Sequence, residues 1–462
     1  MKYIAVFLLL FSFSCSSDDE TPIPPKPNSN PGSIKIDEIS FDGKNVTIDW
    51  SDAQDADGDQ IFYKLYINSI LIMESTESIG RSILNYNSEY SGRIIGTDKK
   101  GGVVEIDFDI STPKSKILFY TDGFGYVNAF DLYTLKPLWR SETSFIETHS
   151  VYGNIIYTGS NGINGLDILT GELLWTSTPS INYNREYRNI IFDESNVYAF
   201  DVDSNLHCVD KNTGGKLWER SFLDYYAPLT LDSEKVFVCS RNDDNLFAIN
   251  KKTGLVDWSF EVDPNYSSAA IRINSNPLII NNNIYFGDNL GRFYSVNKNS
   301  GIKNWSVSAP QYTSFNVSPT LYENQIITGT LGVMYSLDLN TGDEKWRYAA
   351  QQGSFSTSPF IYKDRVYSGV DGNGSGELIC LDAKTGQLIW KFDLESNVTC
   401  SPIVHEDVVY IGDWNSSFFA VNALTGVLDW KIKTEEVIFK SPTIVIGEGE
   451  EVIYPSIHGL KN

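Results

Sequence analysis

The stretch Ala420–Trp430, AVNALTGVLDW, occurs in eight related copies along the chain. Every copy ends in a tryptophan, and successive tryptophans are separated by 36 residues (139 to 175) to 47 residues (258 to 305). A period of about 40 to 45 residues is the length of one four-stranded propeller blade. The sequence therefore predicts an all-β fold with an eight-bladed β-propeller, and seven blades with an irregular seam is the alternative. The tryptophans are Trp139, Trp175, Trp218, Trp258, Trp305, Trp346, Trp390 and Trp430.

Each position of the repeat has a physical reason. The glycine, Gly426 in this copy, takes the positive φ of a tight turn between two strands. Asn422 and Thr425 hydrogen-bond the backbone of that turn. The tryptophan is expected to wedge between neighbouring blades, and a small residue opposite it, here Ala420, makes room for the ring. Only the first copy departs from the pattern, with Leu135 in place of the glycine.

This motif resembles the tryptophan-docking motif of the pyrroloquinoline-quinone-type (PQQ-type) β-propeller. The resemblance covers residues 116 to about 460. That fold is found in quinoprotein dehydrogenases, in the propeller lipoprotein of the outer-membrane β-barrel assembly machinery, and in many binding proteins. Fold alone does not choose among these functions.

A second pattern predicts the strand order within each blade. A proline, as in Ser401-Pro402, begins the first strand, because proline there loses no ladder hydrogen bond. The first copy starts at Ile117 and lacks such a strand, whereas the chain ends with a surplus one at residues 441–446. We expect this C-terminal strand to complete the first blade and close the ring. The pattern predicts a further strand at 451–456 without placing it.

The N-terminus resembles a lipoprotein signal. Residues 1–14 contain one lysine followed by an apolar run that is too short to span a bilayer. The sequence then predicts cleavage before Cys15 and acylation of its thiol. The acidic stretch after Cys15 either resembles the export tag of surface lipoproteins or is a solvated linker. Residues 15–32 are predicted to be a flexible tether, and the protein an outer-membrane lipoprotein that faces the periplasm or the cell surface.

Residues 33–112 are predicted to be a separate small β-sandwich, before a propeller at 113–462. Alternating strands and two aromatic residues resemble a fibronectin type III domain, which would place Trp50 in the core and make Tyr90 the corner tyrosine. Asp55, Asp57 and Asp59 invite a calcium interpretation. However, the twelfth position of an EF-hand loop would be Tyr66, so we interpret the stretch as a polar turn and predict no metal site.

The sequence contains no catalytic constellation. The five cysteines include no adjacent pair of the kind that quinoprotein dehydrogenases use, and no haem-attachment motif. The four histidines have no metal-site spacing. We therefore expect no enzyme activity and no cofactor; PQQ with calcium belongs only to the dehydrogenase alternative.

The loops between the last strand of one blade and the first strand of the next are the expected binding face. They open on one side of the propeller around its axis, and most contain Tyr, Phe or Arg, which are enriched where partners bind. The candidates are Tyr183, Arg185, Arg188, Tyr266, Arg272, Tyr312, Phe315 and Phe355. The alternative is that these rings pack between blades.

These features predict a membrane-anchored, non-enzymatic scaffold that uses a propeller face to bind protein, similar to the propeller subunit of the barrel-assembly machinery. A surface glycan-binding protein is the alternative, since tyrosine rings suit the apolar faces of sugars. A PQQ-dependent dehydrogenase is the second alternative. The formal charge of -23 disfavours nucleic acid as a partner.

Overall fold

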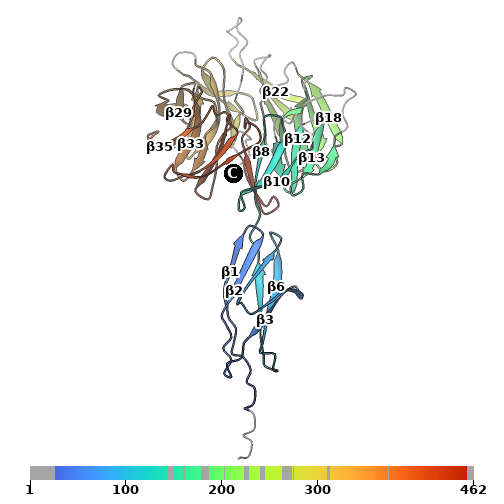
Figure 1. Cartoon of the computed structure of the whole chain (residues 1–462). Helices are drawn as coiled ribbons and strands as arrows, with labels where there is room; N and C mark the ends of the chain where they lie inside the picture. The colour runs from blue at the N-terminus through green and yellow to red at the C-terminus, as the bar shows by residue number, and fades with distance from the viewer. Residues whose placement is uncertain are drawn as a thin grey trace, which may run out of the picture. The chain divides into compact units, whose positions relative to one another are not determined.

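A computed structural model describes residues 26–142, 149–159, 162–177, 187–201, 203–222, 228–239, 245–262, 273, 275–309, 313–372 and 374–454, with the backbone alone at 187–189. The chain divides into two compact units, Met1–Thr112 and Pro113–Asn462, and Figure 1 shows both. The predicted boundary at residue 112 coincides with this division. In the described ranges no helix has the length and apolar character needed to cross a lipid bilayer.

The first unit consists of two antiparallel sheets. One sheet has the order β1-β2-β5 and the other β4-β3-β6-β7. Side chains from both sheets form one core, in which Trp50 is 1% exposed and lies edge-on to Tyr63. The Tyr90 hydroxyl accepts a hydrogen bond from the Asn85 backbone N–H at 3.0 Å. The strands are β1 (Ile36–Asp42), β2 (Asn45–Trp50), β3 (Phe62–Ile67), β4 (Ile70–Ser75), β5 (Ile79–Ile83), β6 (Glu89–Thr97) and β7 (Val103–Ser111).

The second unit is a β-propeller, and its described part contains eight sheets, each with one copy of the tryptophan motif. Seven of these sheets are each built from one stretch of chain. The first has β11 (His149–Tyr152), β12 (Ile155–Gly159), β13 (Ile163–Asp167) and β14 (Leu173–Thr176). The second has β15 (Tyr187–Phe192), β16 (Asn196–Asp201), β17 (Asn205–Asp210) and β18 (Lys216–Ser221), and the third has β19 (Leu229–Leu231), β20 (Lys235–Cys239), β21 (Asn245–Asn250) and β22 (Val256–Glu261).

The next four sheets follow the same antiparallel order, with one extra short strand. They are β23 (Leu278–Ile280), β24 (Asn283–Gly287), β25 (Arg292–Asn297) and β26 (Lys303–Ser308); β27 (Phe315–Tyr322), β28 (Gln325–Thr330), β29 (Val333–Asp338) and β30 (Glu344–Ala349); β31 (Ser354–Phe355), β32 (Phe360–Tyr362), β33 (Arg365–Asp371), β34 (Gly376–Asp382) and β35 (Leu388–Leu394); and β36 (Ile403–His405), β37 (Val408–Asp413), β38 (Ser417–Asn422) and β39 (Leu428–Lys433).

The eighth sheet joins the two ends of the unit. Its order is β10-β9-β8-β40-β41, formed by β8 (Lys116–Thr121), β9 (Val127–Asp131), β10 (Lys136–Arg140), β40 (Thr443–Ile446) and β41 (Glu451–Ile453). In the β8–β40 ladder, Val445 lies opposite Ile117 and Ile444 opposite Leu118. The C-terminal strand thus supplies the strand that the first copy lacks, as predicted. The strand that the sequence could not place is β41, which pairs with β40.

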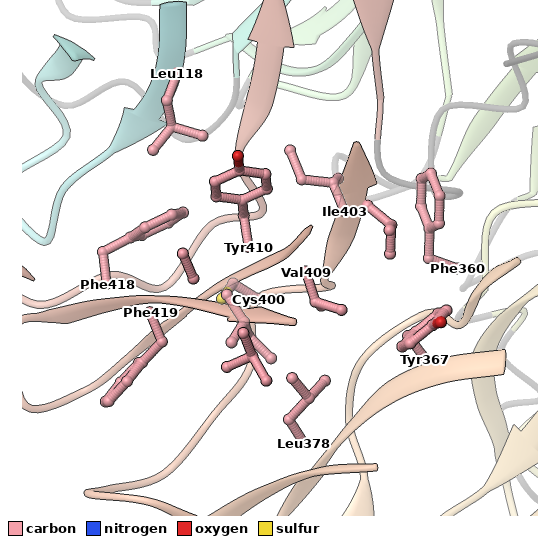
Figure 2. Close-up of a cluster of buried hydrophobic side chains, with 14 of the residues drawn as sticks. Leu118, Phe360, Tyr367, Leu378, Cys400, Ile403, Val409, Tyr410, Phe418 and Phe419 are labelled. Atoms are coloured by element: carbon pink, nitrogen blue, oxygen red, sulfur yellow. The ribbon is translucent and has the colours of Figure 1, made fainter. Parts of the chain in front are cut away.

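A hydrophobic cluster packs this closing sheet against its neighbour. It combines Leu118 of β8 with Tyr410 and Phe418 of the β36–β39 sheet (Figure 2). The ring of Tyr120 stacks on that of Phe418 at a centroid distance of 6.2 Å. Residues at the start and at the end of the unit therefore share one core, which makes closure of the ring part of the folded structure.

Each motif turn has the geometry that its residues favour. Gly426 has a φ of 73° and donates its N–H to the Asn422 carbonyl at 2.8 Å. The Asn422 side-chain oxygen accepts the N–H of Leu424 and of Thr425, both at 3.0 Å. At the first copy Leu135 adopts the same kind of conformation, with a φ of 53°. The turn is therefore kept even where the glycine is missing.

Each tryptophan pairs with the small residue of its own motif across the sheet. Trp175 lies opposite Gly165, and a β-carbon added there would approach the indole to 2.6 Å. The other pairs are Trp139 with Ala129, Trp218 with Cys208, Trp258 with Ala248, Trp305 with Ser295, Trp346 with Ser336, Trp390 with Cys380 and Trp430 with Ala420. Larger side chains would not fit beside the ring.

The indole also contacts the motif turn of the following sheet. Trp346 donates its Nε1–H to the Ala383 carbonyl at 2.9 Å, and a β-carbon on Gly386 would come within 2.5 Å of the same ring. The equivalent donations run from Trp139 to Ile168, from Trp218 to Lys251, from Trp258 to Lys298 and from Trp390 to Ala423. The tryptophan therefore connects each of these sheets to the next.

Substitution of Gly386 by alanine is expected to lower the unfolding free energy of the propeller by about 2 to 4 kcal/mol, since it adds both positive-φ strain and overpacking against Trp346. Gly374→Ala is the matched control. Gly374 has a φ of 89° but has no atom within 4 Å of an added β-carbon, so it should cost only about 1 to 2 kcal/mol. Denaturant unfolding of both variants measures the difference. Equal losses would show that contact with the indole contributes nothing.

Candidate functional site

The predicted binding residues fall into two groups. Tyr183, Arg185, Tyr266, Arg272 and Tyr312 lie outside the described residues, and for Arg188 only the backbone within β15 is described. Their role in binding stays a prediction.

Two of the predicted binding residues are buried instead. Phe315 is 1% exposed and packs against the rings of Phe293 and Tyr335, at centroid distances of 5.3 and 5.8 Å. Phe355 is 0% exposed and its ring lies 6.5 Å from that of Tyr348. The prediction that these two rings line a binding face is therefore wrong. Both lie in inner strands, β27 and β31, and strand alternation turns their side chains into the core.

A pocket of about 500 Å³ opens on this face of the propeller, where the inner strands begin. We call it the axial pocket, because its lining comes from the entry segments of several sheets rather than from one. The lining residues are His149, Asn316, Ser318, Ser356, Ser358, Thr399, Ser401, Trp414, Phe439, Lys440 and Ser441. Phe439 and Lys440 lie in the loop between the last strand of one sheet, β39, and the inner strand of the next, β40.

Serines that precede strand-starting prolines link three pairs of neighbouring sheets. The Ser358 N–H donates to the Ser401 hydroxyl at 2.9 Å, and the Ser401 N–H donates to the Ser441 hydroxyl at 2.8 Å. The Asn276 N–H donates to the Ser318 hydroxyl in the same way, at 3.0 Å. Equivalent positions of successive sheets can hydrogen-bond directly only where the sheets converge. The Ser-Pro repeat was the signal for this arrangement, although it predicted only strand starts.

Two aromatic side chains lie at the rim of the axial pocket. Trp414 follows β37 and Phe439 precedes β40, and they are 39% and 37% exposed. Their rings meet at right angles with centroids 5.3 Å apart. The Trp414 Nε1–H donates to the Thr399 hydroxyl at 3.0 Å, and that hydroxyl donates to the Phe439 carbonyl at 3.3 Å. These contacts hold an exposed indole in one orientation.

Buried aspartates end the second strand of several sheets on the same face. Asp201 and Asp413 are both 0% exposed. Burial opposes ionisation of Asp201, but hydrogen bonds from His207 and Asn205 outweigh it and hold its pKa below the ordinary value. Burial raises the pKa of Asp413, whose hydrogen bonds come from backbone N–H groups such as that of Ser417. The two aspartates occupy equivalent strand ends, but their pKa values shift in opposite directions.

The buried cysteines and His149 have the surroundings of structural residues. Within the described residues the cysteines Cys208, Cys239, Cys380 and Cys400 are free and buried, and burial raises the pKa of each thiol. His149 is buried and its Nδ1 lies 2.9 Å from the Thr121 hydroxyl. The thiols are therefore poor nucleophiles.

The acidic loop of the first unit offers carboxylate oxygens to a cation. One oxygen each from Asp55, Asp59 and Asp98 lies within 4.8 Å of the others. Lys100 already pairs with Asp59 at 2.5 Å, and the Asp55 carboxylate accepts backbone N–H groups of its own loop. These hydrogen bonds fit the predicted polar turn, and the absence of a metal ion there stays a prediction.

The repeat also identifies the family. A family model described as outer membrane protein assembly factor BamB matches residues 88–221, 160–320 and 330–457, which is more than half of the chain. The chain belongs to the BamB family. It is 24% identical over 261 residues to the outer membrane protein assembly factor BamB of Shewanella oneidensis, covering 56% of this chain and 55% of that protein. The chain thus spans about half the length of that BamB relative.

Two further likenesses show how widely the fold is used. The crystal structure of BamB from Moraxella catarrhalis has a TM-score of 0.53 and 18% identity, covering 66% of this chain and 94% of that chain, and it supports the propeller fold. Quinohemoprotein alcohol dehydrogenase ADH-IIG of Pseudomonas putida is 28% identical over 166 residues, which is 33% of this chain and 21% of that protein. This chain is therefore similar both to a BamB structure and, over a third of its length, to a dehydrogenase.

The buried aspartates provide a paired test of the electrostatics of this face. Asp413→Asn is expected to leave the unfolding free energy at pH 7 unchanged or slightly higher, because it removes a buried charge while an oxygen still accepts the backbone N–H groups. Asp201→Asn is expected to lower it by about 1 to 3 kcal/mol, since it disturbs the contact with His207. Denaturant unfolding at neutral pH measures both.

The pH dependence of the same variants has a definite sign. The pKa of Asp413 is raised on folding, so above about pH 4 the unfolded state loses this proton first, and the contribution of Asp413 to stability falls as pH rises through the raised pKa. This decline should be absent in Asp413→Asn. A steeper decline in the variant, or a loss at pH 7 as large as that of Asp201→Asn, would contradict the assignment.

Proposed function

We propose that this protein is a non-enzymatic scaffold of outer-membrane protein assembly. The observation that carries the proposal is the match of the BamB family model across the tryptophan-docked sheets. A closed ring has no free sheet edge at its seam, so its loops are displayed on a rigid frame. Loops on a rigid scaffold are where binding residues concentrate, and the loop face of the propeller is therefore the proposed partner surface.

The proposed location is the outer membrane, on its periplasmic or cell-surface side. The Shewanella oneidensis relative is named as an outer membrane protein assembly factor. The signal-like residues 1–14 and Cys15 support a lipid anchor, and residues 15–32 would separate the folded units from the lipid. Cys15 lies outside the described residues, so the anchor rests on the sequence pattern.

A PQQ-dependent dehydrogenase is the second candidate, because a quinohemoprotein relative matches part of the chain. The sequence has no adjacent cysteine pair of the kind that resemblance would imply. Among the axial-pocket residues, Lys440 is the one lysine or arginine, whereas a quinone with several carboxylates calls for more positive charge. These features favour the scaffold.

Photo-crosslinking in cells tests the partner surface. A photoreactive residue in place of Tyr183 or Tyr312 is expected to capture proteins of the β-barrel assembly machinery, because both positions lie in the predicted binding loops. The matched control is Tyr152, an exposed residue at the end of β11, away from the end where the inner strands begin. Mass spectrometry identifies the captured proteins. Capture of those proteins from Tyr152 alone would place the partner surface elsewhere, and capture of none would count against the scaffold.

Removal of Cys15 tests the anchor. Cys15→Ser is expected to move the protein from the membrane fraction to the soluble fraction, because acylation requires the thiol, whereas the thermal unfolding of the propeller should not change. Intact-mass measurement of the wild-type protein should show the added lipid. A mature wild-type protein with an unmodified Cys15 would disprove the anchor and leave the fold unaffected.

A further inference from the structure

We infer that the axial pocket binds a carbohydrate, with the sugar hydroxyls directed at the serine hydroxyls and one face of the sugar ring against Trp414. This inference is independent of the assembly role, since a scaffold can bind its protein partners with or without a sugar in this pocket. The pocket volume of about 500 Å³ lies within the range of small-ligand sites, which is about 300 to 1,000 Å³.

The serine hydroxyls present hydrogen-bond donors. The hydroxyl oxygens of Ser318, Ser401 and Ser441 each accept a backbone N–H from the preceding sheet. A hydroxyl that accepts one hydrogen bond still has its own O–H to donate. Among the described contacts no protein acceptor takes these three protons. The floor of the pocket therefore suits a ligand that carries several oxygen acceptors close together.

Ser358 adds a hydroxyl with a different property. The Ser358 backbone N–H donates to the Ser401 hydroxyl, but among the described hydrogen bonds the Ser358 hydroxyl has no partner. Ser358 is 6% exposed, so its hydroxyl lies within the pocket rather than in bulk solvent. This hydroxyl is not among the buried side-chain atoms that lack a partner, so it is open to the pocket and can donate to a bound acceptor in place of water.

The rim supplies the apolar contact that a sugar requires. Trp414 and Phe439 are exposed at the mouth, and Thr399 fixes the orientation of the indole. An aromatic face carries negative charge density, which attracts the polarised C–H groups on the flat face of a pyranose ring. Hydroxyl donors below and a fixed aromatic face above match the two surfaces of a sugar.

Other ligand classes fit less well. A polyanion is opposed by the formal charge of -23 and has only the Lys440 ammonium as a permanent positive charge in the lining. An extended peptide needs acceptors for its backbone N–H groups, whereas the Ser318, Ser401 and Ser441 oxygens already accept one N–H each. The Lys440 ammonium is itself a donor to neutral sugar oxygens.

The test uses the full mature protein in detergent and three sugar probes: a peptidoglycan disaccharide, lipopolysaccharide core oligosaccharide, and neutral glucan oligosaccharides. Calorimetry and tryptophan fluorescence should show saturable binding of at least one probe, and the probe that binds identifies the source of the sugar. Trp414→Ala is expected to weaken binding at least tenfold. Ser358→Ala should weaken it severalfold without changing thermal unfolding, because that hydroxyl makes no described protein contact.

Tyr152→Ala is the control, because it removes an exposed ring outside the axial pocket and should leave binding unchanged. The inference is overturned if the folded wild-type protein binds none of the three probes, or if binding survives both Trp414→Ala and Ser358→Ala undiminished. Saturable binding of PQQ with calcium, or of an unstructured peptide, in place of every sugar would likewise overturn it.

Discussion

The contact between each tryptophan and the motif turn of the next sheet is the interaction on which this propeller depends. A single four-stranded sheet cannot bury both of its faces, so the sheets must stack. The indole of Trp346 reaches Ala383 and Gly386 of the following sheet, and the same contact recurs around the ring. The turn glycine has a double role: it adopts a positive φ and leaves space for the ring.

The seam shows what happens where that contact is altered. Leu135 occupies the glycine position at the closing sheet and joins the same apolar cluster as Trp430. There the C-terminal strand β40 pairs with β8 through a backbone ladder, so hydrogen bonding between chain ends supports the closure. A ring closed in this way holds the inner strands at fixed distances around the axis. The hydrogen bonds between serines of neighbouring sheets and the axial pocket depend on those distances.

The outcome for the binding loops shows the limit of composition as a guide. Phe315 and Phe355 were candidates because aromatic residues are enriched at interfaces, but the structure buries both. Phe315 and Val317 alternate with the exposed Asn316, and that pattern is typical of a half-buried strand. Trp414 was not a candidate, since it lies in a turn within a sheet, yet the axial pocket places it at the rim beside Phe439.

The sequence by itself determined the propeller repeat, the order of strands and the C-terminal strand that completes the first sheet. These follow from local rules, because turn glycines, strand alternation and a wedge residue recur at fixed spacing. Only the tertiary structure decided which side chains meet at the axis. Ser358, Ser401 and Ser441 are about 40 residues apart and are brought together by the rotation from one sheet to the next, and no local pattern encodes the position at which such residues converge.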